Sequence, residues 1–142
     1  MRTLPPLPFS AMQDVPVTWL RDALVGKVEL AVLFGSVAAG RTHAECDIDL
    51  AFWPLPGADL DRLTGEMMSV LGTDRVDVAD LRRGDGLLQW IVASRGCLVY
   101  QDRPGRFAEF AARAERRWQD ERHRLPFLWR AIDLWFERRG IR

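Results

Sequence analysis

The sequence predicts an α/β (α+β) domain with a small sheet, helices on both sides of it and a helical tail. Three observations carry this prediction. Short apolar runs typical of buried strands alternate with stretches of helical periodicity, in the order α-β-β-α-β-α-β-α-α. Hydrophobic residues make up 48% of the 142 residues, enough for one sizeable core. The last third of the chain is helical in pattern throughout.

Each strand has its own signal. Residues 28–36 form a nearly continuous apolar run that ends in Gly-Ser, typical of a strand buried on both faces. Residues 46–53 alternate between apolar and acidic side chains until Pro54, so one face should carry the acidic groups and the other the apolar ones. Residues 75–81 and 97–101 predict two further short strands.

The helices follow from apolar residues at helical spacing. A first helix should begin near Val17, pack Trp19 and its neighbours on one side, and stop at Gly26. A second, rich in leucine and methionine, should end at Gly72. The third and the two C-terminal helices are expected at residues 86–94, 107–118 and 128–136.

We expect one domain over residues 1–142, with a core at about 17–102 and C-terminal helices at about 104–139. The formal net charge is zero, but residues 1–102 carry 9 basic and 14 acidic side chains, whereas residues 103–142 carry 11 and 6. We therefore do not expect a protein whose main role is to bind the charged phosphate backbone of nucleic acid without sequence specificity. The two cysteines and the short apolar runs predict a cytoplasmic protein with no membrane segment.

Two strands carry carboxylates that could hold a metal ion. Asp47 and Asp49, two residues apart on a strand, point to the same side, and this pairing favours either a solvated strand face or a bound cation such as Mg²⁺. Asp77, flanked by valines, should lie on a neighbouring strand and complete a set able to hold two metal ions. Asp80 is expected to cap the following helix, with the role of third ligand as its alternative.

Gly35 and Ser36 complete the candidate site. A glycine lets the backbone approach a ligand, and a serine that opens a short turn or helix can offer its hydroxyl and amide to a phosphate or simply cap that helix. Residues 35–42 also match the outline of a Walker A loop with Arg41 in the lysine position, but the next strand begins too soon for the helix that such a loop requires.

Gly35-Ser36, ten residues, and then Asp47-x-Asp49 resembles the signature of the DNA-polymerase-β-like nucleotidyltransferases, and the short chain resembles their minimal nucleotidyltransferase (MNT) group. The resemblance implies a nucleotidyltransferase palm, two Mg²⁺ ions on Asp47, Asp49 and Asp77, and ATP as nucleotide donor. The chain departs from the family at Ala39, where an arginine is usual, which leaves Arg41 as a possible substitute for nucleotide binding.

The resemblance also implies a partner. Many minimal nucleotidyltransferases act as antitoxins that transfer AMP from ATP to a tyrosine of a HEPN ribonuclease toxin, and we expect the same of this chain, without sequence-specific binding of nucleic acid. Two alternatives stay open: an antitoxin that neutralises its toxin by binding alone, and transfer to a small-molecule hydroxyl such as that of an aminoglycoside. The arginines and tryptophans of the C-terminal helices are either a solvated face or a partner surface.

Overall fold

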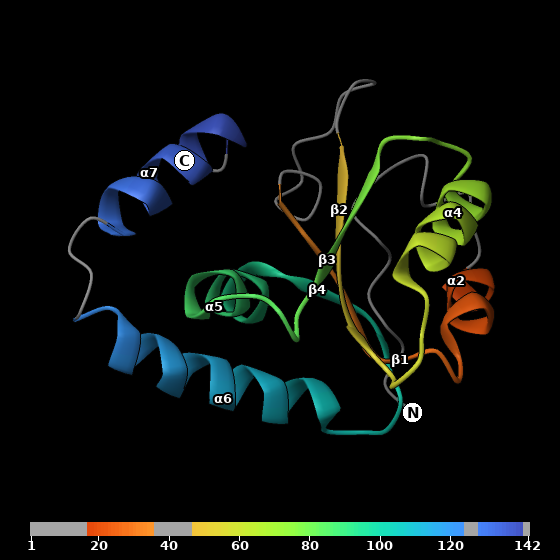
Figure 1. The fold of residues 1–142 in the computed structure, drawn as a ribbon, viewed down its shortest axis with the longest axis horizontal. Coiled ribbons are helices and arrows are strands. Elements are labelled where there is room, and N and C mark those ends of the chain that lie inside the picture. The colour runs from red at the N-terminus through yellow and green to blue at the C-terminus, as the bar shows by residue number, and fades with distance from the viewer. Residues whose placement is uncertain (1–16, 36–46, 124–127, 141–142) are drawn as a thin grey trace.

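The computed structural model describes residues 17–35, 47–123 and 128–140 (Figure 1). A four-stranded mixed sheet stands in the middle of the molecule with helices on both faces, which confirms the predicted fold class. The strand order is β3-β2-β1-β4. β1 runs antiparallel to β2 and β4, and β2 runs parallel to β3. The strands are β1 (Val28–Phe34), β2 (Ile48–Pro54), β3 (Val76–Asp80) and β4 (Cys97–Gln101).

In the part of the chain that the structure describes, helices lie on both faces of this sheet. Helices α2 and α4 pack on one face, and α5 and α6 pack on the other, with α7 lying beside α5 (Figure 1). Their bounds are α2 (Val17–Leu24), α4 (Leu60–Leu71), α5 (Gly86–Arg95), α6 (Arg106–Glu121) and α7 (Leu128–Arg138). Gly72 ends α4 in the left-handed conformation, with φ of 68°, as the sequence predicts.

Alternation along the two central strands decides what each face carries. On β2, the side chains of Ile48 and Leu50 enter the core under α2 and α4. Ala51 belongs to the other core, under α5 and α6, and Asp49 shares its side of the strand because strand side chains alternate. The acidic and apolar sides of this strand are therefore separated as predicted. β1 is buried on both faces, also as predicted.

Helix α7 is attached through aromatic and apolar side chains. Ile132 and Phe136 are buried against Trp118 of α6. The guanidinium of Arg95, at the end of α5, lies 4.3 Å from the centre of the Phe136 ring. These contacts direct the C-terminal end of α7 toward the edge of the sheet where β2 and β3 begin (Figure 1).

Two local predictions were wrong. Trp19 does not join the packed side of α2, since 59% of it is exposed; Leu20 and Leu24 fill that side. Asp80 does not cap α5, because its carboxylate binds Arg82 two residues on. Asp85 caps that helix by accepting the Leu88 N–H at 2.8 Å. An aspartate directly before a helix is the better cap, and the turn between β3 and α5 places only Asp85 there.

Within the described ranges, no helix combines the length and hydropathy needed to cross a bilayer.

Candidate active site

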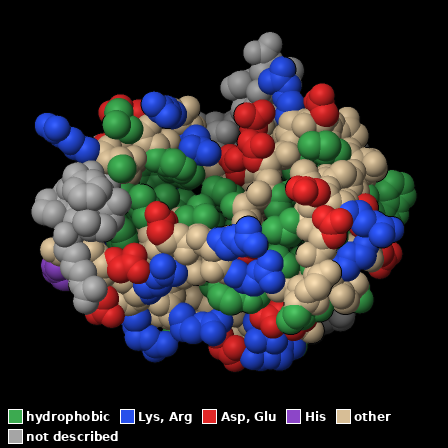
Figure 2. Space-filling model, in the orientation of Figure 1, with side chains coloured by type: hydrophobic (Ala, Val, Ile, Leu, Met, Phe, Trp, Pro, Cys, Tyr) green, Lys and Arg blue, Asp and Glu red, His purple; other side chains and the backbone are tan. Residues whose placement is uncertain are grey.

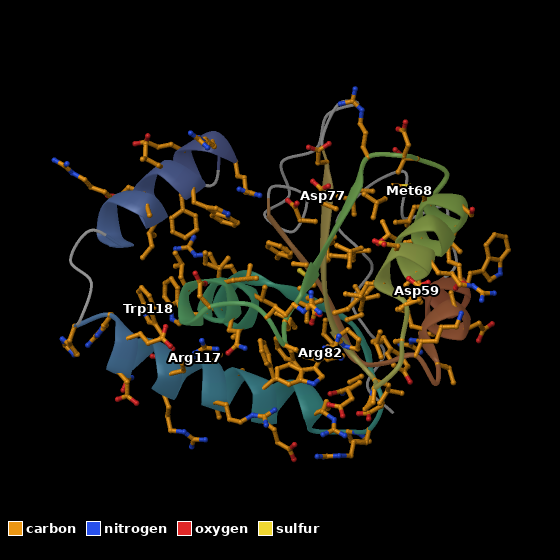
Figure 3. The ribbon with its side chains drawn as sticks, in the orientation of Figure 1. Asp59, Met68, Asp77, Arg82, Arg117 and Trp118 are labelled. Carbon is orange, nitrogen blue, oxygen red and sulfur yellow. The ribbon has the colours of Figure 1, made fainter. Side chains whose placement is uncertain are left out.

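The three predicted carboxylates gather at one edge of the sheet. Asp49 and Asp77 are register partners on the parallel strands β2 and β3, and Asp47 comes directly before β2. In a parallel ladder, register partners lie about 5 Å apart with their side chains on the same face. Figure 3 labels Asp77 at this edge, and Figure 2 shows acidic side chains gathered there. Asp47 and Asp77 are exposed, whereas Asp49 is only 6% exposed.

Gly35 makes room for the Asp49 carboxylate. It directly follows Phe34, whose register partner across the antiparallel ladder is Asp49. Gly35 has φ of +79°, in the left-handed region that favours glycine. A Cβ atom built on it would overlap Oδ2 of Asp49. The glycine is therefore required both for its backbone conformation and for the close approach of this carboxylate.

The electrostatics of Asp49 suit a cation site. Burial raises the pKa of Asp49 above its usual range, and the negative charges of Asp77 and Asp47 raise it further, while Arg139 opposes the rise. Oxygen donors on a buried, crowded carboxylate are the ligands that a hard divalent ion prefers. The residues present fit such an ion in kind. In residues 17–35, 47–123 and 128–140, however, no three potential ligands converge closely enough to hold a metal.

An arginine from the far end of the chain faces Asp49. Nε of Arg139, one residue beyond α7, lies 3.6 Å from Oδ2 of Asp49. The Arg139 guanidinium is stacked on the Trp135 ring, 4.2 Å from its centre. Trp135 in turn stacks on Phe34, with ring centres 6.3 Å apart and planes 5° from parallel. An aromatic and cationic stack thus runs from the end of β1 to the buried carboxylate.

The other predicted site residues are distributed as follows. Ser36 and Arg41 lie outside the described residues. Asp80 is the register partner of Phe52 and lies three residues along β3 from Asp77, so it is remote from Asp49 and is paired with Arg82 instead. Side-chain hydrogen bonds from Arg82 hold the pKa of Asp80 below its usual range. The alternative of Asp80 as third ligand is therefore disfavoured.

Trp135 and Arg139 were not predicted as residues of this site. Their spacing of four residues places them on one side of a helix, and this was the available signal. That signal shows that the two side chains can stack, but not that they reach a sheet edge more than 80 residues away in the sequence.

This sheet topology, with carboxylates on neighbouring strands and a glycine packed against one of them, is typical of the nucleotidyltransferase class of fold and site. A family model described as "Polymerase beta, Nucleotidyltransferase" matches residues 22–104. The chain therefore belongs to the polymerase β nucleotidyltransferase family. That membership makes it a nucleotidyltransferase, as predicted. No curated protein matches the chain significantly.

Several solved structures are similar to the whole fold. A toxin–antitoxin structure with AMP-PNP shares 26% identity at a TM-score of 0.65, covering 82% of this chain and 94% of that one. A structure of a tri-AMPylated Shewanella oneidensis HEPN toxin with its MNT antitoxin shares 24% identity at a TM-score of 0.59, covering 82% and 91%. An MntA-HepT structure shares 24% identity at a TM-score of 0.59, covering 82% of this chain and 92% of that one. The fold is thus that of the minimal nucleotidyltransferase group, which confirms the predicted resemblance.

Proposed function

We propose that this protein is an MNT-type antitoxin that transfers AMP from ATP to a tyrosine hydroxyl of a HEPN toxin, with divalent metal ions bound at Asp47, Asp49 and Asp77. The observation that carries this proposal is the pairing of Asp49 with Asp77 on neighbouring strands, with Asp47 directly before β2 and Gly35 against the Asp49 carboxylate. Such a set of carboxylates can hold two Mg²⁺ ions, which would neutralise the triphosphate and stabilise the attacking and leaving oxygens.

The chain's own groups have distinct roles in this reaction. The acceptor oxygen forms a bond to the α-phosphorus of ATP, the bond from that phosphorus to the β-phosphate oxygen breaks, and pyrophosphate leaves. The hydroxyl proton passes to Asp77, whose exposed carboxylate is open to an incoming acceptor. Gly35 keeps the backbone close to Asp49, and Ser36 and Arg41, which follow it in the sequence, would bind phosphate oxygens. Positioning and charge neutralisation supply most of the catalysis.

The acceptor is proposed from the similar structures. One is a toxin–antitoxin structure with AMP-PNP, an ATP analogue, and in another a HEPN toxin carries AMP groups beside its MNT antitoxin. These matches cover 82% of the present chain. They support ATP as the donor and a toxin side chain as the acceptor.

The exposed side of α6 is a suitable place for that partner. Arg113, Arg116 and Arg117 are exposed there, and Arg117 pairs with Glu121 within the helix. Figure 2 shows basic side chains along this lower border of the molecule. The positive charge of residues 103–142 is expected to face an acidic surface.

Asp77→Asn tests the proposal. We expect it to lower AMP transfer from radiolabelled ATP to the co-expressed toxin by about 100-fold, the usual contribution of a proton-accepting group. Asp80→Asn is the matched control, because Asp80 lies on the same strand but pairs with Arg82. It should transfer AMP like the unmodified protein. Thermal unfolding of both variants checks that they fold.

A second candidate function, neutralisation by binding alone, has one observation in its favour. Asp49 already faces Arg139, and no three described ligands converge. This alternative predicts that toxin is neutralised without ATP and by Asp47→Ala, with loss of neutralisation when the chain is truncated after about Arg106. If the unmodified protein labels no toxin but still neutralises it, this alternative replaces AMP transfer. Transfer to an aminoglycoside stays a prediction, tested by offering that acceptor in the same assay.

A further inference from the structure

Arg139 is the least expected component of the acidic edge. Its Nε atom lies 3.6 Å from Oδ2 of Asp49, longer than a hydrogen bond, so the two charges attract without being locked together. Besides this contact with Asp49, the Arg139 guanidinium contacts the Trp135 ring. A guanidinium has five N–H donors, so it can bind a further acceptor as well.

A second contact, with an aromatic ring, also supports this guanidinium. Trp135, one helical turn earlier, supports it face to face at 4.2 Å, and Trp135 is fixed by its stack on Phe34 and by an edge contact with Phe136 at 5.3 Å. Stacking of arginine on an aromatic ring leaves the N–H groups at the rim of the guanidinium free to bind oxygen. Arg139 is thus held in place on an aromatic platform and directed at the candidate site.

The charges of the site call for such a group. Three carboxylates and a triphosphate together carry more negative charge than two divalent ions can neutralise. The Arg139 guanidinium lies next to Asp49, so it would be close to phosphate oxygens bound to a cation that this carboxylate held. Arginine also matches phosphate geometrically, because its planar fork can donate two parallel hydrogen bonds.

We propose that Arg139 binds the triphosphate of the nucleotide, so that the end of helix α7 completes a nucleotide site built mainly on the sheet. This inference rests on the proposed nucleotidyl transfer. Without nucleotide, Arg139 is a counter-charge for Asp49; with nucleotide and metal, it turns from the carboxylate to phosphate oxygens. Trp135 is its positioning residue.

Arg139 should therefore have opposite effects on the binding of nucleotide and on the binding of metal alone. An uncharged residue at 139 should weaken nucleotide binding, because a charged hydrogen-bond donor is lost. The same change should leave the binding of metal alone unchanged or make it tighter, because a competing cation has been removed from Asp49. A residue that only stabilised the fold would weaken both.

The test compares Arg139→Gln with Arg138→Gln in the full-length protein. Glutamine keeps much of the side-chain stem and removes the charge, and Arg138 is the exposed neighbour on the same helix end. Calorimetric titrations would use α,β-methylene-ATP with Mg²⁺, and separately Mn²⁺ without nucleotide. We expect Arg139→Gln to weaken analogue binding about 10- to 100-fold, the range for hydrogen bonds to charged groups, and Arg138→Gln to change it by less than about threefold.

Three results would overturn the inference. The first is equal analogue affinity in the two variants, and the second is a parallel loss of analogue and Mn²⁺ affinity in Arg139→Gln. The third is faster AMP transfer by Arg139→Gln, which would mean that Arg139 blocks the site. Transfer by the unmodified protein is measured alongside. If it transfers AMP and Arg139→Gln binds the analogue normally, only this inference fails. If it transfers nothing but binds the analogue through Arg139, only the proposed function fails.

Discussion

Asp49→Asn should lower AMP transfer by at least about 1000-fold, because Asp49 would help to hold the metal ions that supply several kcal/mol of transition-state stabilisation. Asparagine has the same shape but offers one weaker oxygen donor and no charge. The labelling assay with radiolabelled ATP and co-expressed toxin measures the loss. Asp59→Asn, on the exposed cap of α4, provides a carboxylate control outside the site.

The same substitution should leave the protein as stable as before or more stable at neutral pH. Since the pKa of Asp49 is raised on folding, the folded protein takes up this proton at higher pH than the unfolded chain. Ionised Asp49 therefore costs stability, and the cost grows as the pH rises from the ordinary aspartate value of 3.8 through the raised folded value. The advantage of Asp49→Asn in urea unfolding should be present at pH 7 and vanish below pH 3.8.

Two results would contradict this account of Asp49. Substantial labelling by Asp49→Asn would remove it from the metal site. A stability loss at pH 7 that disappears on acidification would mean that its charge is stabilising in the folded protein, as in a strong ion pair with Arg139.

Gly35→Ala should destabilise the protein and abolish transfer. A left-handed backbone costs a residue with a Cβ about 1–2 kcal/mol. At this position, the added atom also overlaps the Asp49 carboxylate, which is packed against the glycine. We expect a total loss of about 2–5 kcal/mol in urea unfolding, because displacing a packed group commonly adds 1–3 kcal/mol.

Gly57→Ala is the matched control for this change. Gly57 has φ of +82°, close to that of Gly35, but a Cβ there meets nothing within 4 Å. It should lose only the backbone cost of about 1–2 kcal/mol and keep full transfer activity. The difference between the two variants measures the overlap with Asp49. Equal losses of stability, with transfer intact in both, would show that the carboxylate does not depend on the close approach of residue 35.

The strands and their faces could be predicted because a strand has a period of two. Alternation of acidic and apolar residues from Asp47 to Leu50 places the carboxylates on one side without any knowledge of the rest of the fold. Asp77 follows the same rule on a strand flanked by valines. Its register partner, Asp49, follows from the pairing of β2 with β3, which agrees with the predicted neighbouring strands.

Features set by contacts distant in the sequence could not be predicted. The approach of Arg139 to Asp49 depends on how α7 docks on α5 and α6, and no local pattern encodes that docking. The exposure of Trp19 has the same cause: leucines on the adjacent helix face fill the space under α2, so the larger ring remains outside. In the turn before α5, the residue that caps the helix, Asp85 and not Asp80, is decided by where the helix begins.

We propose above that Asp47, Asp49 and Asp77 bind the metal ions that hold the nucleotide. A crystal structure with Mn²⁺ and α,β-methylene-ATP, recorded at a wavelength where manganese scatters anomalously, tests it most directly. We predict two anomalous peaks, each about 2.1 Å from carboxylate oxygens of this set and from phosphate oxygens, the distance typical of small divalent ions. Two results would contradict this proposal. One is nucleotide bound elsewhere on the protein. The other is the absence of anomalous peaks at these carboxylates, with Arg139 still in contact with Asp49.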